Sequence, residues 1–353
     1  MTLKSAKKLP RERVERIFIR GTNWIGDAVI TLAAVSAIRG TYPNARIFVL
    51  AKPWVVDIYR LCPGVDEVII YESPGVHEGI AGIFRLAKKL RAMNFDVAIL
   101  LQNAMEAAII ARLAGIPVRA GYNTDARGFL LTHPVVRTKA IKKIHQVGYY
   151  VEMVKALGCQ EAFHGSFLRL TDEDKEKAGR LLPDYGLDEE RPIIGMAPGA
   201  TYGPAKKWFT ERFASLADRL KEEFSGQIIL FGSAGDRETT TAVERSARHS
   251  LIDLAGATDL RTTVSLIARC RLFISNDSGL MHVAGGLNVP TIAIFGSTNP
   301  LTTSPVGDKN TVIYRGVDCS PCLRETCPTD FRCMDLITTD EVYNVAKRIL
   351  CGR

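Results

Sequence analysis

The sequence predicts an α/β protein with two doubly wound parallel sheets in tandem. Short apolar runs alternate with amphipathic helical patterns along the whole chain, as in sheets whose strands are joined by helices. The length of 353 residues is enough for two ordinary domains. A break at residues 183–186 (PDYG) divides the alternation into two similar halves without a sequence repeat. We therefore expect domains at residues 1–183 and 184–337, followed by an amphipathic helix at residues 338–353.

The first half begins with an apolar strand pattern at residues 16–20, a glycine-containing loop and a helix with small apolar residues on one face. Further strands are expected at residues 46–50, 67–71, 96–101 and 117–120, and helices at residues 54–61, 79–93, 105–114, 143–157 and 171–182. Residues 123–143 show no periodicity and are rich in Thr, Gly, Pro and cations. We interpret them as a long functional or mobile loop.

The second half repeats the alternation. Strands are expected at residues 192–196, 227–231, 251–253, 271–275 and 291–295, and helices at residues 210–224, 237–248, 260–268, 278–287 and 338–350. Because strand, turn, helix and strand follow one another from residue 271 to residue 295, this unit should be a parallel crossover.

The net charge of +8 is concentrated in the first half of the chain. Residues 1–150 carry 22 Lys or Arg against 11 Asp or Glu, a net charge of +11, so the remainder carries −3. Basic clusters at residues 4–20, 85–91 and 137–143 suit an anionic partner such as a phosphorylated lipid, a membrane surface or nucleic acid. Each cluster alone is also compatible with a solvated helix face. No aromatic or arginine readout motif accompanies them, which disfavours nucleic acid.

The sequence contains no apolar run of the ~20 residues that a membrane-spanning helix needs. The first 20 residues are charged throughout and lack the apolar core of a secretion signal. We therefore expect a cytoplasmic protein.

The turn at residues 275–286 (SNDSGLMHVAGG) is the strongest candidate for a binding site. Asn276, Asp277 and Ser278 place capping side chains where a strand ends and a helix starts. Gly279 lets a ligand approach the backbone, and the free N–H groups of a helix N-terminus favour a phosphate or diphosphate. The alternative is an ordinary helix N-cap that binds nothing.

Three other strand-to-helix turns carry possible chemistry. Asp27 falls in the first turn of the first helix, where it could act as a base or only compensate the helix dipole, worth ~0.3–1 kcal/mol. The loop at residues 198–208 ends in Lys206 and Lys207, either of which could neutralise a leaving diphosphate or remain solvated. In the turn at residues 231–236, Asp236 could accept a ribose hydroxyl.

Four of the eight cysteines, Cys319, Cys322, Cys327 and Cys333, lie close together in the sequence. Thiolates in a cytosolic protein are more often metal ligands than disulfide partners, so these are candidate ligands for zinc or an iron–sulfur group. Their spacing departs from the common zinc pattern of two Cys pairs, which leaves a metal-free structural loop as the alternative.

Residues 20–27 (RGTNWIGD), 198–206 (PGATYGPAK), 231–234 (FGSA) and 276–284 (NDSGLMHVA) together resemble the bacterial heptosyltransferases of glycosyltransferase family 9, most closely the heptosyltransferase II type. This resemblance implies a GT-B architecture, in which two Rossmann-like domains face each other across a cleft. It also implies that the C-terminal helix returns to the N-terminal domain.

The resemblance assigns roles by position. Asp27 matches the general base, and Lys206, rather than Lys207, matches the lysine that contacts the donor diphosphate. Asp277, Ser278 and Gly279 match the donor-binding turn. Further donor-site residues implied by the resemblance are Gly26, Thr201, Gly232, Asp236 and His282. His282 is equally compatible with a packing role.

The implied reaction is an inverting transfer of L-glycero-D-manno-heptose from ADP-heptose to the inner core of lipopolysaccharide, placing the second heptose on the first. The implied acceptor is a lipid A–Kdo–heptose at the inner leaflet of the inner membrane, with the enzyme peripheral to its cytoplasmic face. No cofactor is expected to be required, although a structural metal could bind the cysteines. The alternatives are another core position, another nucleotide heptose, or a non-catalytic protein that binds nucleotide sugars.

Overall fold

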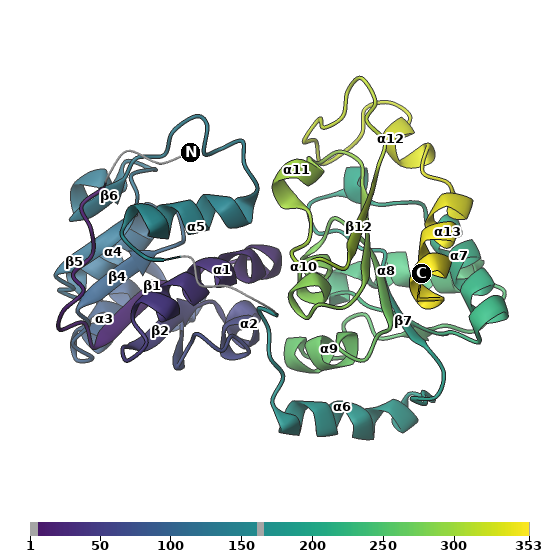
Figure 1. The fold of residues 1–353 in the computed structure, drawn as a ribbon, viewed down its shortest axis with the longest axis horizontal. Coiled ribbons are helices and arrows are strands. Elements are labelled where there is room, and N and C mark those ends of the chain that lie inside the picture. Colours follow the sequence, from purple (N-terminus) through teal and green to yellow (C-terminus); the bar gives the residue numbers. More distant parts are fainter. Residues whose placement is uncertain (1–5, 161–165, 353) are drawn as a thin grey trace. The chain divides into compact units, whose positions relative to one another are not determined.

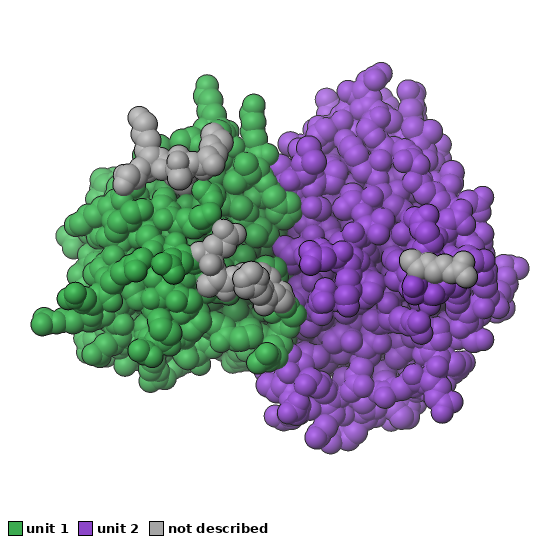
Figure 2. Space-filling view, viewed as in Figure 1, with its two compact units in different colours: residues 1–169 green, residues 170–353 purple. Residues whose placement is uncertain are grey.

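The computed structural model describes residues 6–160 and 166–352. The chain divides into two compact units, residues 1–169 and residues 170–353 (Figure 2). The division falls before α6 (Asp172–Asp184), whereas we expected it after this helix. The reason is a tertiary contact: α6 packs on α9 (Leu260–Ile267), and Arg261 Nε donates to Asp174 Oδ1 at 2.6 Å. This pairing attaches α6 to the second unit.

The first unit is built on a six-stranded parallel sheet with the order β3-β2-β1-β4-β5-β6 (Figure 1). Its strands are β1 (Arg16–Arg20), β2 (Arg46–Ala51), β3 (Glu67–Ile70), β4 (Val97–Leu100), β5 (Val118–Tyr122) and β6 (His133–Val135). Its α-helices are α1 (Ile25–Thr41), α2 (Val56–Arg60), α3 (Gly79–Arg91), α4 (Met105–Leu113) and α5 (Gln146–Ala156). Apolar side chains of the sheet, α3 and α4 form a shared core.

The interpretation of residues 123–143 as one long functional or mobile loop was wrong in part. This region contains β6 and a 3₁₀ turn, η2 (Arg127–Leu130), and β6 pairs in parallel with β5. The segment is organised by Arg127, whose buried guanidinium donates to the carbonyl oxygens of Tyr122 and Gln102. A three-residue strand is too short to show a period, which is why the sequence pattern did not reveal it.

The second unit contains another six-stranded parallel sheet, with the order β12-β11-β10-β7-β8-β9. Its strands are β7 (Ile193–Ala197), β8 (Gln227–Leu230), β9 (Ile252–Asp253), β10 (Leu272–Asn276), β11 (Thr291–Phe295) and β12 (Asn310–Tyr314). Besides α6 and α9, its α-helices are α7 (Thr210–Phe224), α8 (Arg237–Ser246), α10 (Gly279–Gly286), α11 (Pro300–Thr303), α12 (Arg332–Asp335) and α13 (Thr339–Leu350). Read from its other edge, this strand order follows the same plan as the first sheet. The predicted fold class, two Rossmann-like doubly wound parallel sheets, is thus confirmed.

The last helix, α13, belongs to the second unit. Its apolar face, which includes Val342 and Ala346, is buried in the core of the second unit, and the helix packs against α7, β10 and β11. The expectation that this helix returns to the N-terminal domain was therefore wrong. Its amphipathic pattern was recognised correctly, but such a pattern does not specify which sheet the helix will cover.

Each sheet changes the direction of its strand order at one place, between β1 and β4 in the first unit and between β7 and β10 in the second. In open parallel sheets, ligands bind at the carboxyl ends of the strands that flank such a switch point. The loops that follow β7 and β10 are the ones that the sequence selected as candidate binding loops.

Candidate functional site

Lys206 and Asp277 form a buried ion pair at the switch point of the second sheet. Lys206 Nζ lies 2.7 Å from Asp277 Oδ2, and the two side chains are 15% and 6% exposed. Thr298 Oγ1 donates to the same carboxylate oxygen at 2.6 Å. The ammonium group also lies 4.9 Å from the centre of the Tyr202 ring. Loops that follow β7, β10 and β11 therefore meet at one carboxylate.

Asn276, the last residue of β10, connects the same loops through its amide. Its Oδ1 accepts from the backbone N–H of Trp208 at 3.0 Å, and its Nδ2 donates to the Pro198 carbonyl oxygen at 2.7 Å. The sequence had suggested that Asn276, Asp277 and Ser278 cap the helix, and this was wrong. Ser278 occupies the N-cap position of α10 but makes no side-chain hydrogen bond there. The N-terminus of α10 therefore lies beside the ion pair without a capping side chain.

Lys207 points elsewhere. Its Nζ donates to Thr239 Oγ1, on α8, at 2.9 Å. Of the two adjacent lysines, Lys206 is thus the one that lies beside the N-terminus of α10. Lys206 is also the lysine that the resemblance selects for the donor diphosphate, which remains a prediction.

The loops after β7 and β8 approach each other closely at Asp236. A Cβ atom on Gly199 would lie 2.1 Å from Asp236 Oδ1, and one on Gly232 would lie 2.8 Å from Asp236 Cβ. The other carboxylate oxygen, Oδ2, accepts from the Ser233 N–H at 2.9 Å and from its hydroxyl at 2.7 Å. Only glycine at positions 199 and 232 allows the backbone to come this close to Asp236. The Asp236 carboxylate, which we expected near a ribose, also stabilises its own turn through Ser233.

Thr201 and His282 differ in their exposure. Thr201 lies in the exposed turn after β7, whereas His282 lies on α10 and is buried. Burial on a helix that packs against β10 and β11 is compatible with the packing role that the sequence left open.

A cysteine-rich segment, residues 319–333, lies against the loop that carries Lys206. The backbone N–H of Ala205 donates to the Glu325 carbonyl oxygen at 2.9 Å, and the Tyr202 hydroxyl donates to the Leu323 carbonyl oxygen at 2.7 Å. Gly203 has a φ of 151°, and a Cβ atom there would lie 2.4 Å from the Glu325 oxygen. The cysteine-rich segment therefore fixes the backbone of the loop that carries Lys206.

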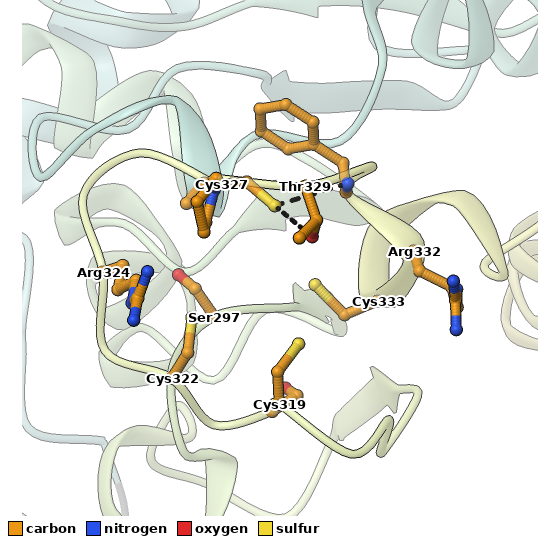
Figure 3. A pocket seen from close by; sticks show the side chains of 12 residues that line it. Ser297, Cys319, Cys322, Arg324, Cys327, Thr329, Arg332 and Cys333 are labelled. Atoms are coloured by element: carbon orange, nitrogen blue, oxygen red, sulfur yellow. Dashed lines mark hydrogen bonds between the residues drawn. The ribbon is translucent and has the colours of Figure 1, made fainter.

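The four cysteines of this segment line one cavity of about 450 Å³ together with Ala205, Arg324 and Arg332 (Figure 3). Burial and then the neighbouring thiols raise the pKa of Cys333. A hydrogen bond with Thr329 lowers the pKa of Cys327, whose sulfur also accepts from the N–H of Phe331. Within residues 6–160 and 166–352, no three His, Cys, Asp or Glu side chains are already arranged as a metal site.

Asp27 and Gly26 belong to the first unit, whereas every other predicted site residue lies in the second. Both are in the first turn of α1, at the carboxyl end of β1. The pKa of Tyr150 on α5 is raised well above its usual value, first by burial and next by the negative charge of Asp27. Asp27 thus lies within electrostatic range of a buried phenol.

The loop before Asp27 is held by buried side chains that the sequence did not single out for this task. Arg20 donates to Asn23 Oδ1 at 2.8 Å and to the Leu50 carbonyl oxygen at 3.2 Å. The Tyr59 hydroxyl accepts from the Thr22 N–H at 2.8 Å, and a Cβ atom on Gly21 would lie 2.7 Å from the Tyr59 ring. These contacts set the position from which α1 starts.

Thr298 is the site residue that sequence reasoning missed. Thr298 follows β11, which lies next to β10 in the sheet. The carboxyl ends of parallel strands meet at one edge, and this rule could have identified Thr298 from the sequence.

Residues 83–331 match the family described as Glycosyltransferase family 9 (heptosyltransferase). The chain belongs to this family. Lipopolysaccharide heptosyltransferase 2 from Salmonella typhimurium (strain LT2) is 34% identical over 307 residues, which cover 84% of this chain and 87% of the relative. Lipooligosaccharide heptosyltransferase 2 from Haemophilus influenzae (strain Rd) is 35% identical over 313 residues, 84% of this chain and 88% of the relative.

Among solved structures, this family 9 chain is similar to the E. coli ADP-heptose lps heptosyltransferase II. The TM-score is 0.80 at 30% identity, with 96% of this chain and 99% of the other covered. The resemblance to heptosyltransferases of the second type and the GT-B fold class are confirmed.

Proposed function

We propose that this protein is an inverting glycosyltransferase that moves L-glycero-D-manno-heptose from ADP-heptose to the first heptose of the lipopolysaccharide inner core. Membership of family 9 and the similarity to heptosyltransferases 2 support the class of reaction. The observation that carries the proposal is the meeting of Lys206, Asp277 and the N-terminus of α10 at the switch point of the second sheet. This is where a doubly wound sheet binds a nucleotide.

The donor diphosphate would bind between the Lys206 ammonium and the N–H groups of Ser278 and Gly279. A helix N-terminus favours an anion, and the missing side-chain cap leaves α10 suited to accept one. Negative charge grows on the diphosphate as the glycosidic bond breaks. Donors that are already in place stabilise this charge without reorganisation.

Asp236 and the glycines that face it support the nucleotide half of the same proposal. The close approach of Gly199 and Gly232 to Asp236 brings backbone from two strand ends to one carboxylate. Asp236 Oδ2 is occupied by Ser233, so we assign Oδ1 to a ribose hydroxyl. Gly26, Thr201 and His282 remain proposed donor-site residues on the basis of the resemblance.

Asp27 would act as the general base. It would take the proton from an acceptor hydroxyl as the oxygen attacks the anomeric carbon from the face opposite ADP, which inverts that centre. The basic first unit would hold the phosphorylated sugar-lipid acceptor. Asp27 lies within electrostatic range of the buried Tyr150, whose pKa is raised by burial and then by the charge of this carboxylate.

The transfer requires no metal in this proposal. Cys319, Cys322, Cys327 and Cys333 stay candidate ligands for a structural metal, because their thiols line one cavity, although as placed they do not form a metal site. Metal analysis of protein purified with and without added zinc or iron tests this. A stoichiometric metal that is lost in Cys322→Ser would establish the site, and metal-free protein of full activity would exclude it.

We also propose that the protein works at the surface of a membrane, on its cytoplasmic side. None of the described helices is long and apolar enough to cross a membrane. The support for surface association is the chemistry of the proposed acceptor, a lipid, and the basic first half of the chain.

The test is ADP release from ADP-heptose with and without a lipid A–Kdo–heptose acceptor. We expect release that depends on the acceptor in the native protein, and a loss on the order of 100-fold in Asp27→Asn with donor affinity kept. Asp57→Asn is the matched control, since Asp57 is also a first-turn carboxylate of the first unit. Tight donor binding without release would favour the non-catalytic alternative, and release with a different core acceptor would favour another core position.

A further inference from the structure

Helix α3 of the first unit, located in Figure 1, carries large apolar side chains that are exposed. Ile80 is 77% exposed and Phe84 is 56% exposed. Val76, in the turn just before the helix, is 50% exposed, and Arg85 Nη1 donates to its carbonyl oxygen at 2.8 Å. Among the described helices, α3 is the one that carries two large, exposed apolar side chains. Single exposed apolar residues are ordinary, but neighbours on one stripe indicate a contact surface.

The positions of these residues follow from helical geometry. Ile80, Phe84 and Lys88 are spaced four apart, so they lie in one row along the helix. The opposite face is occupied: Leu86 and Leu90 are buried in the core of the first unit. Ile80 and Phe84 are therefore not needed for packing of α3 against the core. They lie next to basic residues of the same helix.

The charge within α3 has one sign, and the exposed carboxylate nearest to it in the sequence is Glu78, the N-cap residue. Arg85, Lys88, Lys89 and Arg91 are exposed on α3, and residues 79–93 contain no Asp or Glu. Basic residues in the last turn also complement the helix dipole, but that effect needs one or two cations and no exposed Phe or Ile. A row that begins with apolar side chains and continues with lysines matches the interface of an anionic bilayer, where apolar groups enter the acyl boundary and cations stay with the headgroups.

We propose that the α3 face, comprising Val76, Ile80, Phe84, Arg85, Lys88 and Lys89, docks the first unit onto an anionic lipid bilayer. The proposal deepens the function proposed above and rests on it, because a lipid-linked acceptor requires the enzyme to work at a bilayer. The proposal assigns one partner, an anionic bilayer, to the basic cluster at residues 85–91. Apolar insertion and headgroup attraction act together, so neither the apolar nor the basic residues suffice alone.

The experiment is co-sedimentation of the full chain with vesicles of phosphatidylcholine alone and of phosphatidylcholine with 30% phosphatidylglycerol. We expect binding to the anionic vesicles that weakens with added salt. Ile80→Ser combined with Phe84→Ser, and Lys88→Glu combined with Lys89→Glu, should each lower the vesicle partition coefficient at least ten-fold.

Matched controls lie outside the basic clusters of the first half. Phe129→Ser removes an aromatic side chain that is 79% exposed on η2, and Lys347→Glu with Arg348→Glu reverses an adjacent pair of exposed cations on α13. Both controls should keep vesicle binding within about two-fold of native. Thermal unfolding of every variant checks that the fold is intact.

A soluble acceptor without acyl chains separates this proposal from the proposed function. The α3 variants should release ADP at the native rate with that acceptor and lose rate only with acceptor embedded in vesicles. Unchanged vesicle binding in both α3 variants would overturn the docking surface while leaving the transferase intact. A variant that instead loses concentration-dependent self-association would show that the face contacts a second copy of the chain. No ADP release from the native protein with either acceptor would contradict the proposed function, and vesicle binding would still be judged on its own.

Discussion

Lys206 Nζ lies 2.7 Å from Asp277 Oδ2, in a pair of side chains that are both largely buried. The cation that we assign to the donor diphosphate is therefore neutralised before any donor arrives. A diphosphate must share this ammonium with Asp277, which the Thr298 hydroxyl also holds in place. Asp277 thus positions the lysine, and the N-terminus of α10 provides the additional attraction for the anion.

Removing Asp277 should destabilise the protein strongly. Asp277→Asn leaves the Lys206 ammonium buried without its counter-charge, which typically costs roughly 3 kcal/mol or more of unfolding free energy. Urea denaturation, followed by a signal from the second unit, measures the change in unfolding free energy. The control is Asp340→Asn, whose partner Arg219 is 34% exposed while Asp340 itself is 80% exposed. That change should cost less than about 1 kcal/mol, and equal losses in the two variants would contradict the role given to the buried pair.

The two adjacent lysines should differ in their effect on catalysis. Lys206→Met should lower kcat/KM for ADP-heptose on the order of 100-fold, because a charge that stabilises the leaving diphosphate is lost. Lys207→Met should change it less than about three-fold, since this side chain hydrogen-bonds to Thr239 instead. Initial rates at varied donor concentration decide between them. A larger loss in Lys207→Met would reverse the assignment.

A methyl group at Gly203 should displace the loop that carries Lys206. Its Cβ would meet the Glu325 carbonyl oxygen at 2.4 Å, and the φ of 151° is unfavourable for other residues. We expect Gly203→Ala to raise the donor KM at least ten-fold. Gly235→Ala is the comparison, because its nearest contact would be Ser233 Oγ at an ordinary 3.6 Å. Native kinetics in Gly203→Ala would show that the cysteine-rich segment does not fix this loop.

The link between α6 and α9 predicts a specific loss of stability in acid. Partial burial alone would raise the pKa of Asp174, but hydrogen bonds from Arg261 and Thr171 outweigh it and lower the pKa to about 2. Because the folded pKa lies below the unfolded value, Asp174 stabilises the fold fully above pH ~4, and this stabilisation is lost as the pH falls toward 2.

Asp174→Asn should therefore reduce the unfolding free energy by roughly 2 kcal/mol at pH 7 and by progressively less below pH ~4. Chemical denaturation at pH 7, 4.5 and 3 measures the difference. Asp172→Asn should show a smaller difference, because the ion pair of Asp172 with Lys175 is exposed to solvent and therefore screened. A constant difference across this range would mean that Asp174 does not titrate with a lowered pKa.

The sequence predicted most strands and helices because their periods repeat over whole elements. The exceptions are edge strands. β6 has three residues, and β12 buries only Ile313 fully, so neither shows a regular alternation of buried and exposed positions.

Tertiary contacts explain the remaining differences. Asn276 was interpreted as a capping residue from its position before α10, but its partners are Trp208 and Pro198, about seventy residues earlier in the chain. Asp277 likewise pairs with Lys206. Local rules identified residues able to form hydrogen bonds in this turn, and the partners were decided by which loops the sheet order brings together. Lys206 was selected over Lys207 only by the resemblance to family 9, and its contact with the donor remains a prediction.

The common strand order of the two units has a consequence for how such a chain can change. Each sheet has its own core and its own switch point, so residues 1–169 can be altered or exchanged without disturbing the Lys206–Asp277 pair. With the donor and acceptor assigned to the units as proposed above, a new acceptor would require changes in one half of the gene, while the half proposed to bind the nucleotide is inherited intact. Recombination near the unit boundary would be the direct way to produce transferases that share a donor and differ in the sugar they extend.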